Sequence, residues 1–214
     1  MSATSTVSAP QFPAPANLGI LISGRGSNLQ ALIDAVRTGE LDARIAIVIS
    51  NTASATGLER ARAAGIETQT INHRDFQSRD AFDRAVADAL LERGVHLVCL
   101  AGFMRLIGGP MLNAFPNAIV NIHPSLLPAF PGMDAQAQAI AHGVKVSGVT
   151  VHLVTGELDG GPIVVQRAVP VRDDDTPETL AARLLVEEHR AYPEAVKIVL
   201  SGEWRLDGRR FLRL

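Results

Sequence analysis

The sequence predicts an α/β protein: an open, mostly parallel, twisted sheet with helices on both faces and a mixed C-terminal part. Short runs of branched apolar residues recur along the first half of the chain, as in strands that are covered on both faces. Between them, apolar residues follow the i, i+3, i+4, i+7 spacing of amphipathic helices. Strands that alternate with helices in this way form parallel βαβ units.

Each of these elements follows from its own stretch of sequence. The parallel strands are expected at residues 18–22, 45–49, 95–100 and 118–122. Apolar faces predict one helix around residues 29–36 and another around 82–90. In the final third, longer apolar segments predict strands at 149–154 and 163–171, after which the pattern becomes helical again.

The C-terminal part carries clear start and stop signals. Thr176 followed by Pro177 predicts the start of a helix, because threonine caps helix N-termini and proline suits the first turn. Pro193 is expected to kink or end that helix. Residues 204–211, centred on Asp207-Gly208, predict a small hairpin.

Composition excludes several classes of protein. Hydrophobic residues make up 47% of the 214 residues and charged residues 20%, which excludes an intrinsically disordered chain. The 20 Lys and Arg residues balance 22 Asp and Glu residues without a basic cluster, so nucleic acid is not expected as a partner. No apolar run reaches the ~18 residues of a transmembrane helix.

The single cysteine and the N-terminal segment complete this description. Cys99 lies in an apolar run, so we expect a buried thiol in a reducing compartment, with no disulfide and no multi-cysteine zinc site. Residues 1–16 are rich in Ser, Thr, Ala and Pro and are expected to form a disordered tail. Residues 17–214 are expected to form a single domain.

A turn with two glycines joins the first expected strand to the first expected helix, Ser23-Gly24-Arg25-Gly26-Ser27-Asn28-Leu29. Phosphates bind at such turns because glycines admit the ligand to the backbone and the helix N-terminus offers N–H groups. Leu29 replaces the third glycine of the dinucleotide fingerprint and the Walker lysine is absent, so a monophosphate fits better than NAD or ATP. Ser27 and Gln30 match a capping box. The alternative is a tight turn without a ligand.

Asn121 and His123 are two residues apart at the end of an expected strand, and Pro124 stops the pairing there. Both should project together at the edge where open α/β sheets hold their ligands. Asparagine donates hydrogen bonds to carbonyl oxygens, and histidine exchanges protons near neutral pH. The pair therefore favours a catalytic role over a structural one.

Asp159 lies in the glycine-containing turn at residues 158–162. Beside His123, its carboxylate would favour the protonated imidazole and accept a proton from a nucleophile, whereas by itself it would only shape the turn. The other five histidines lack metal-ligand spacing, so no catalytic metal is expected.

Four separated motifs resemble those of phosphoribosylglycinamide formyltransferases: residues 22–30, 101–105, 121–128 and 158–162. They occur in the same order as in that family, from Leu18 to the helix around Pro193. The resemblance implies a Rossmann-like formyltransferase fold. It also implies formyl transfer from 10-formyltetrahydrofolate, a co-substrate, to the amine of N1-(5-phospho-D-ribosyl)glycinamide in purine biosynthesis.

The same resemblance implies the roles of individual residues. The implied catalytic residues are Asn121, His123 and Asp159. The implied ribonucleotide-binding residues are Gly26, Ser27, Asn28 and Glu188. The implied formylfolate-binding residues are Arg79, Met104, Arg105, Leu106, Ile107 and Asn121. Alternatively, the three apolar members of the last group would suit a buried core, and Arg79 a solvated helix face.

The sequence departs from the family pattern at a few positions. Many relatives have histidine or arginine where this chain has Asp134 and Ala137, so the resemblance implies no ligand contact at these two positions. Gly156 stands where many relatives have a more polar residue, which bears on the detailed structure of the folate loop.

Two related enzymes and one non-enzyme are the alternatives. A methionyl-tRNA formyltransferase needs a further C-terminal domain, and a formyltetrahydrofolate hydrolase carries an extra N-terminal one; 214 residues are expected to hold neither. A non-catalytic nucleotide-binding module would keep the phosphate loop and leave His123 unused. We therefore expect a cytoplasmic enzyme with small-molecule substrates, monomeric or homodimeric, without nucleic-acid or membrane partners.

Overall fold

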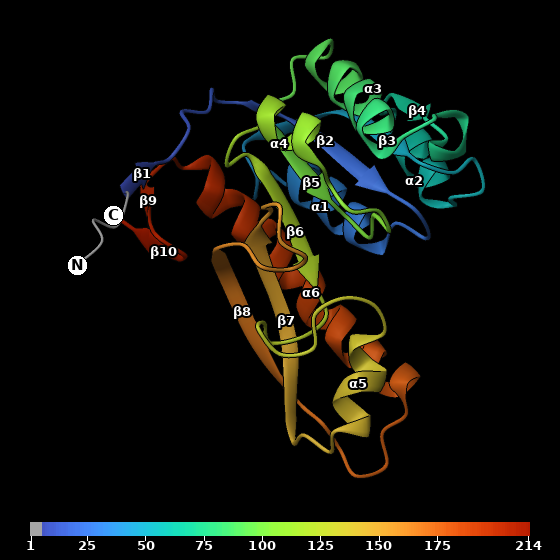
Figure 1. The fold of residues 1–214 in the computed structure, drawn as a ribbon, viewed down its shortest axis with the longest axis vertical. Coiled ribbons are helices and arrows are strands. Elements are labelled where there is room, and N and C mark those ends of the chain that lie inside the picture. The colour runs from blue at the N-terminus through green and yellow to red at the C-terminus, as the bar shows by residue number, and fades with distance from the viewer. Residues whose placement is uncertain (1–5) are drawn as a thin grey trace.

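A computed structural model describes residues 6–214, and the predicted α/β fold is confirmed. The parallel strands of the central sheet are β2 (Ala16–Ile22), β3 (Ala43–Ser50), β4 (Thr68–Thr70), β5 (Leu97–Leu100) and β6 (Ile119–His123). Two antiparallel strands extend it, β7 (Val146–Leu153) and β8 (Ile163–Pro170). The strand order is β4-β3-β2-β5-β6-β7-β8 (Figure 1).

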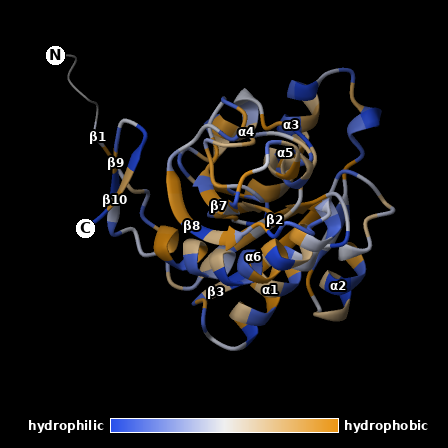
Figure 2. Ribbon diagram, turned by 90° about the horizontal axis from the view of Figure 1, so that it is seen from below, coloured by the Kyte–Doolittle hydropathy of each residue, from blue (hydrophilic) through white to orange (hydrophobic). Residues whose placement is uncertain are grey.

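Helices cover both faces of this sheet (Figures 1 and 2). One face carries α1 (Ser27–Arg37), α2 (Gly57–Ala63) and α6 (Pro177–Leu200). The other face carries α3 (Arg79–Leu91) and α4 (Gly109–Ala114). The short η1 (His73–Asp75) precedes α3, and α5 (Ala135–Ala141) follows β6. None of the helices within residues 6–214 is long and apolar enough to cross a membrane.

The core lies between the sheet and these helices, as the hydrophobic inner faces in Figure 2 indicate. The continuous apolar runs are buried because both faces of the strands are covered; in β5 all four residues are buried. Cys99 is among them, as expected, and burial raises the pKa of its thiol far above the ordinary range. This thiol is therefore a packed side chain rather than a nucleophile.

A second, three-stranded sheet lies beside β8 (Figure 1). It consists of β1 (Thr6–Ser8), β9 (Trp204–Asp207) and β10 (Arg210–Arg213), in the order β1-β9-β10. The hairpin predicted at the C-terminal end is confirmed by the pairing of β9 with β10, and Gly208 turns it with φ of 59°.

The expectation of a disordered tail over residues 1–16 is wrong for the part that the structure describes. Thr6 pairs with Asp207 in β1, and Ala16 is already the first residue of β2. Residues 1–5 lie outside the described residues. Because the partner strand of β1 lies at the opposite end of the chain, no local sequence pattern indicates this pairing.

The start of α6 is confirmed; of the two outcomes expected at Pro193, a kink or an end, the end is wrong. The Thr176 hydroxyl accepts a hydrogen bond from the Thr179 N–H, and the Thr179 hydroxyl accepts one from the Thr176 N–H. Pro193 lies inside the helix, which continues to Leu200. An internal proline costs about 3 kcal/mol. Burial of the apolar helix face before and after it, including Tyr192 and Val196, offsets this cost.

We predict that Tyr192→Phe lowers the free energy of unfolding by about 1–2 kcal/mol, because the buried Tyr192 hydroxyl is a donor to strand carbonyls. It lies 2.8 Å from the Leu100 carbonyl oxygen and 3.3 Å from that of Val120. Urea unfolding followed by circular dichroism measures the change. Ser201→Ala, which removes an exposed hydroxyl at the end of the same helix, is the control. Equal midpoints for Tyr192→Phe and the parent would contradict the prediction.

Candidate active site

Three loops meet at one edge of the central sheet. Because β2, β5 and β6 are adjacent and parallel, their carboxyl ends lie together at that edge (Figure 1). The chain continues from β2 into the loop 23–26 and from β5 into the loop 101–108, while β6 ends at His123. Open α/β sheets bind their ligands at this edge. It is therefore the candidate active site.

The loop after β2 leaves the N-terminus of α1 without a side-chain cap. Gly26 is the N-cap residue, in the left-handed region with φ of 69°, and a Cβ there would lie 2.8 Å from the Gly57 Cα. Only glycine fits both constraints. The expected capping box between Ser27 and Gln30 does not form, since Ser27 is already the first helical residue and Gly26 takes the N-cap position. The first N–H groups of α1 thus remain available to an anion.

Glu188 on α6 faces the same helix end. Asn28 Nδ2 donates a hydrogen bond to Glu188 Oε2 at 2.6 Å, although the two residues are 160 positions apart. Burial raises the pKa of Glu188, and the bond from Asn28 acts against that rise. The other amide atom, Asn28 Oδ1, is buried without a hydrogen-bond partner among residues 6–214. The structure therefore brings Glu188 to the loop of Gly26, Ser27 and Asn28.

The loop after β5 is anchored to α3 by a buried carboxylate. Asp83 Oδ2 accepts the Gly108 N–H at 2.6 Å. Burial raises the pKa of Asp83, while the Gly108 N–H and the charges of Arg79 and Arg105 partly offset that rise. A Cβ at Gly108 would lie 2.7 Å from the carboxylate and 3.4 Å from Arg79 Nε, so a larger residue there would have to displace the Asp83 carboxylate. Arg79 and the loop 101–108 are thus brought together.

Two of the three apolar side chains that would have suited a core, Met104 and Leu106, lie at the surface. Met104 is 71% exposed and Leu106 is 52% exposed, while Ile107 is partly buried against the core. Large exposed apolar side chains beside a ligand-binding edge are typical of a binding surface. For Met104 and Leu106, the core interpretation is therefore wrong.

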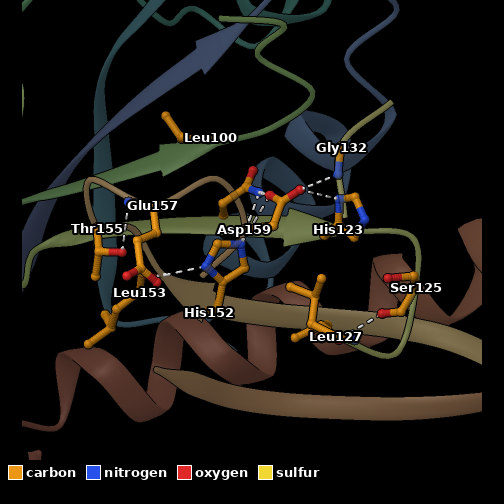
Figure 3. Close-up of polar contacts among 12 residues, drawn as sticks. Leu100, His123, Ser125, Leu127, Gly132, His152, Leu153, Thr155, Glu157 and Asp159 are labelled. Atoms are coloured by element: carbon orange, nitrogen blue, oxygen red, sulfur yellow. Dashed lines mark hydrogen bonds and ion pairs between the residues drawn. The ribbon is translucent and has the colours of Figure 1, made fainter. Parts of the chain in front are cut away.

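Asp159 lies between two histidines at the end of β6, as Figure 3 shows. Its Oδ2 lies 3.3 Å from His123 Nδ1, and its Oδ1 lies 3.7 Å from His152 Nε2. Asn121 Nδ2 lies 3.5 Å from Asp159 Oδ1 and 3.2 Å from His152 Nε2. The structure therefore brings together Asn121, His123 and Asp159, which the sequence singled out, and adds His152.

The turn that carries Asp159 is shaped to present its carboxylate. Asp159 has φ of 49°, a left-handed conformation that aspartate tolerates better than most residues. A Cβ at Gly161 would lie 1.8 Å from the Leu153 carbonyl oxygen, so only glycine fits where the turn returns to β8. The Gly132 N–H donates to Asp159 Oδ2 at 2.8 Å. The conformation of the turn and the Gly132 N–H therefore both hold the carboxylate in place.

The Asp159 carboxyl has a lowered pKa despite its burial. Its side chain is 9% exposed, and burial alone would raise the pKa. The contact with His152, the Gly132 N–H and the charge of His123 outweigh burial, so that the pKa lies below its ordinary value. The carboxyl is thus ionised at neutral pH and serves as an acceptor only.

Both ring nitrogens of His123 face hydrogen-bond acceptors. Nε2 lies 2.8 Å from the Phe130 carbonyl oxygen, and Nδ1 faces Asp159. A carbonyl and a carboxylate can only accept, and only the imidazolium form has an N–H on each nitrogen. Each ring nitrogen of His123 is therefore placed to donate, one to a carbonyl oxygen and the other to a carboxylate.

His152 is a member of this cluster that the sequence analysis missed. It lies on β7, where the antiparallel register places it opposite Asn121. Its Nδ1 donates to the Leu153 carbonyl oxygen at 2.9 Å, which leaves Nε2 to face the cluster. The alternating strand pattern does predict which strand face His152 lies on, but not which strand is its neighbour. Among residues 6–214, no group of three His, Cys, Asp or Glu side chains is arranged to hold a metal ion.

Comparison with known proteins extends these observations. The formyl transferase family model matches residues 16–196. Phosphoribosylglycinamide formyltransferase of Escherichia coli K12 is 44% identical over 193 residues, which cover 90% of this chain and 88% of that protein. A crystal structure of glycinamide ribonucleotide transformylase 1 from Symbiobacterium toebii is 56% identical, with a TM-score of 0.92, and the match covers 93% and 94% of the two chains.

A larger relative matches over part of its length only. The trifunctional purine biosynthetic protein adenosine-3 of Bos taurus is 48% identical over 194 residues, which cover 91% of this chain. The chain spans about a fifth of that protein, 19% of its length. The family match contains Asn121, His123 and Asp159, and the bacterial relatives align over most of both chains. The chain therefore belongs to the formyl transferase family.

Proposed function

We propose that this protein transfers the formyl group of 10-formyltetrahydrofolate to the amine of N1-(5-phospho-D-ribosyl)glycinamide in purine biosynthesis. The products are formylglycinamide ribonucleotide and tetrahydrofolate. The observation that carries the proposal is the cluster of Asn121, His123 and Asp159 beside the uncapped N-terminus of α1. The names of the bacterial relatives support the same reaction.

The phosphate of the ribonucleotide would bind at the start of α1. The free N–H groups of residues 26–28 and the positive end of the helix dipole suit a dianionic phosphate. The unpartnered Asn28 Oδ1 suits a hydroxyl donor of the ribose, and the Glu188 carboxylate offers a second acceptor beside it. The amine end would then extend along the sheet edge toward His123.

The formylfolate would bind over the loop 101–108. Exposed Met104 and Leu106 offer apolar contact to a flat ring, and their backbone carries polar groups for its edges. Arg79 and Arg105 bring two positive charges to the same loop, which suits the carboxylates of the folate tail. Asn121 follows on the neighbouring strand, opposite Leu100, and would contact the formyl end.

The chemistry needs no covalent enzyme intermediate. The amine nitrogen attacks the formyl carbon, and the carbonyl oxygen becomes a tetrahedral oxyanion. Asn121 and protonated His123 would donate hydrogen bonds to that oxyanion, for which the Nε2–H of His123 would exchange the Phe130 carbonyl for the substrate. Such bonds stabilise the transition state by several kcal/mol in a site with little water. As the bond to the folate nitrogen breaks, His123 would deliver its proton to that nitrogen.

Asp159 would keep His123 charged and take part in removing the amine proton. Its carboxylate lies against His123 and is ionised at neutral pH, so it can accept a proton through water. Holding the amine and the formyl carbon in adjacent sites supplies the remaining acceleration by proximity. We further propose that the chain acts as one cytoplasmic domain on small molecules, as a monomer or homodimer, without metal, nucleic acid or membrane.

One assay tests the proposed function. The protein is mixed with 10-formyltetrahydrofolate, and deformylation is followed with and without glycinamide ribonucleotide. We expect turnover only when the amine acceptor is present. Turnover that is independent of the acceptor would indicate a hydrolase, and the absence of turnover with both substrates would indicate a non-catalytic binding module.

We predict that His123→Ala lowers turnover at least about a hundredfold, because it removes the general acid. The affinity for the ribonucleotide should stay within about twofold, since His123 lies two strands away from the start of α1. Steady-state kinetics and calorimetric titration measure the two effects. His96→Ala, at the amino-terminal edge of β5, is the matched control. Turnover within a few-fold of the parent would exclude the role assigned to His123.

We predict that Asp159→Asn destabilises the protein in a pH-dependent manner. A lowered pKa means that the ionised carboxylate stabilises the folded state above the ordinary carboxyl value, near 4. That contribution is lost as the pH falls through this value toward the lowered pKa. The difference in unfolding free energy between parent and variant should therefore shrink between about pH 5 and pH 3. The amide oxygen of the variant could still accept the Gly132 N–H, so the change isolates the charge.

Urea titrations at a series of pH values measure this difference. Asp42→Asn, at an exposed aspartate, is the control and should show little pH dependence. If the difference in unfolding free energy between the parent and Asp159→Asn stays constant across the acid range, the charge of this carboxylate does not stabilise the folded protein.

A further inference from the structure

Ser23 connects three of the loops at the active-site edge. It directly follows β2, and its backbone N–H donates to the Gly102 carbonyl oxygen at 3.0 Å. Its hydroxyl donates to Asn51 Oδ1 at 2.6 Å and accepts the Met104 N–H at 2.8 Å. One small side chain thus joins the loops that follow β2, β3 and β5.

The hydroxyl of Ser23 makes two hydrogen bonds within the protein, one as donor and one as acceptor. It uses its single hydrogen toward Asn51 and accepts a hydrogen bond from Met104, so both contacts fix its orientation. It points into the junction of the three loops, where these two contacts hold it. Its contribution to catalysis would therefore pass through other residues.

Asn51, which accepts the hydrogen bond of the Ser23 hydroxyl, is also held in place. Asn51 is buried, with 6% exposure, and its Nδ2 lies 3.3 Å from His73 Nδ1. The His73 ring packs edge-on against Phe82 at 6.3 Å, and Phe82 stacks on Phe103 at 6.4 Å. Phe103 belongs to the loop after β5, which also contains Met104. These contacts lead from Asn51 back to the loop that contains Met104, so Asn51 cannot shift without moving a packed aromatic group.

We propose that Ser23 is a positioning residue that sets the distance between the ribonucleotide site and the formylfolate site. This inference rests on the proposed function, which assigns residues 26–28 to one substrate and residues 104–107 to the other. The Ser23 hydroxyl is the direct side-chain link between these two loops. Because a shift of about 1 Å between reacting groups can cost a hundredfold in rate, a link of this kind acts on turnover rather than on either affinity.

The test is Ser23→Ala, which leaves the Met104 N–H without its acceptor and Asn51 Oδ1 without its donor. We expect kcat to fall about tenfold or more. The dissociation constants of glycinamide ribonucleotide alone and of tetrahydrofolate alone, measured by calorimetry, should stay within about twofold of the parent values, because each loop keeps its own backbone contacts.

Two further variants make the test specific. Ser54→Ala removes an exposed hydroxyl from the loop after β3 and should leave kcat at the parent value. Asn51→Ala removes the acceptor that orients the Ser23 hydroxyl and should lower kcat while sparing both dissociation constants. If Ser23→Ala does not fold, Asn51→Ala carries the test by itself, with the same criterion.

Each outcome decides the proposal. Parental kcat in Ser23→Ala, or a loss of affinity for one substrate at unchanged kcat, overturns the positioning role. If the parent protein itself transfers no formyl group, the proposed function fails instead, and the parent measurement separates that case from the first. A selective loss of kcat, with both dissociation constants retained, supports the link between the sites.

Discussion

The parallel pairing of β2, β5 and β6 is the constraint on which the rest of the site depends. Parallel neighbours end at the same edge, so three loops from distant parts of the sequence must lie side by side there. The apolar content of the strands enforces this arrangement, because a strand buried on both faces can only lie in the middle of a covered sheet. Asn121 and His123 lie in the carboxyl-terminal part of β6, and Ser23 directly follows β2.

The antiparallel strands β7 and β8, with the turn between them, supply the remaining residues of the cluster, His152 and Asp159. β7 runs back along β6, which places His152 opposite Asn121. The chain then turns through residues 154–162 before it enters β8, and this turn carries Asp159 back over the cluster. A purely parallel sheet would have needed a crossover helix at this point, and the turn would have been remote from β6.

The fold and part of the site could be predicted because their signals are local. Apolar runs located β2, β3, β5 and β6, and the two-residue spacing of Asn121 and His123 indicated a shared strand face. Other features depend on contacts between distant segments. The role of His152 depends on the register of β7 against β6, and β1 depends on a partner near the end of the chain. The expected capping box failed for a similar reason, since the close approach of Gly57 requires a glycine at the N-cap position.

The buried charge of Asp159 ties the order of its loop to the polar contacts of the cluster. An ionised carboxylate that is 9% exposed needs compensation, because burial alone favours its neutral form. The Gly132 N–H and the Asn121 amide donate hydrogen bonds to it, and the two facing histidines add to this compensation. The contacts that keep this buried carboxylate ionised are therefore the same contacts that hold the Asp159 turn over Asn121 and His123.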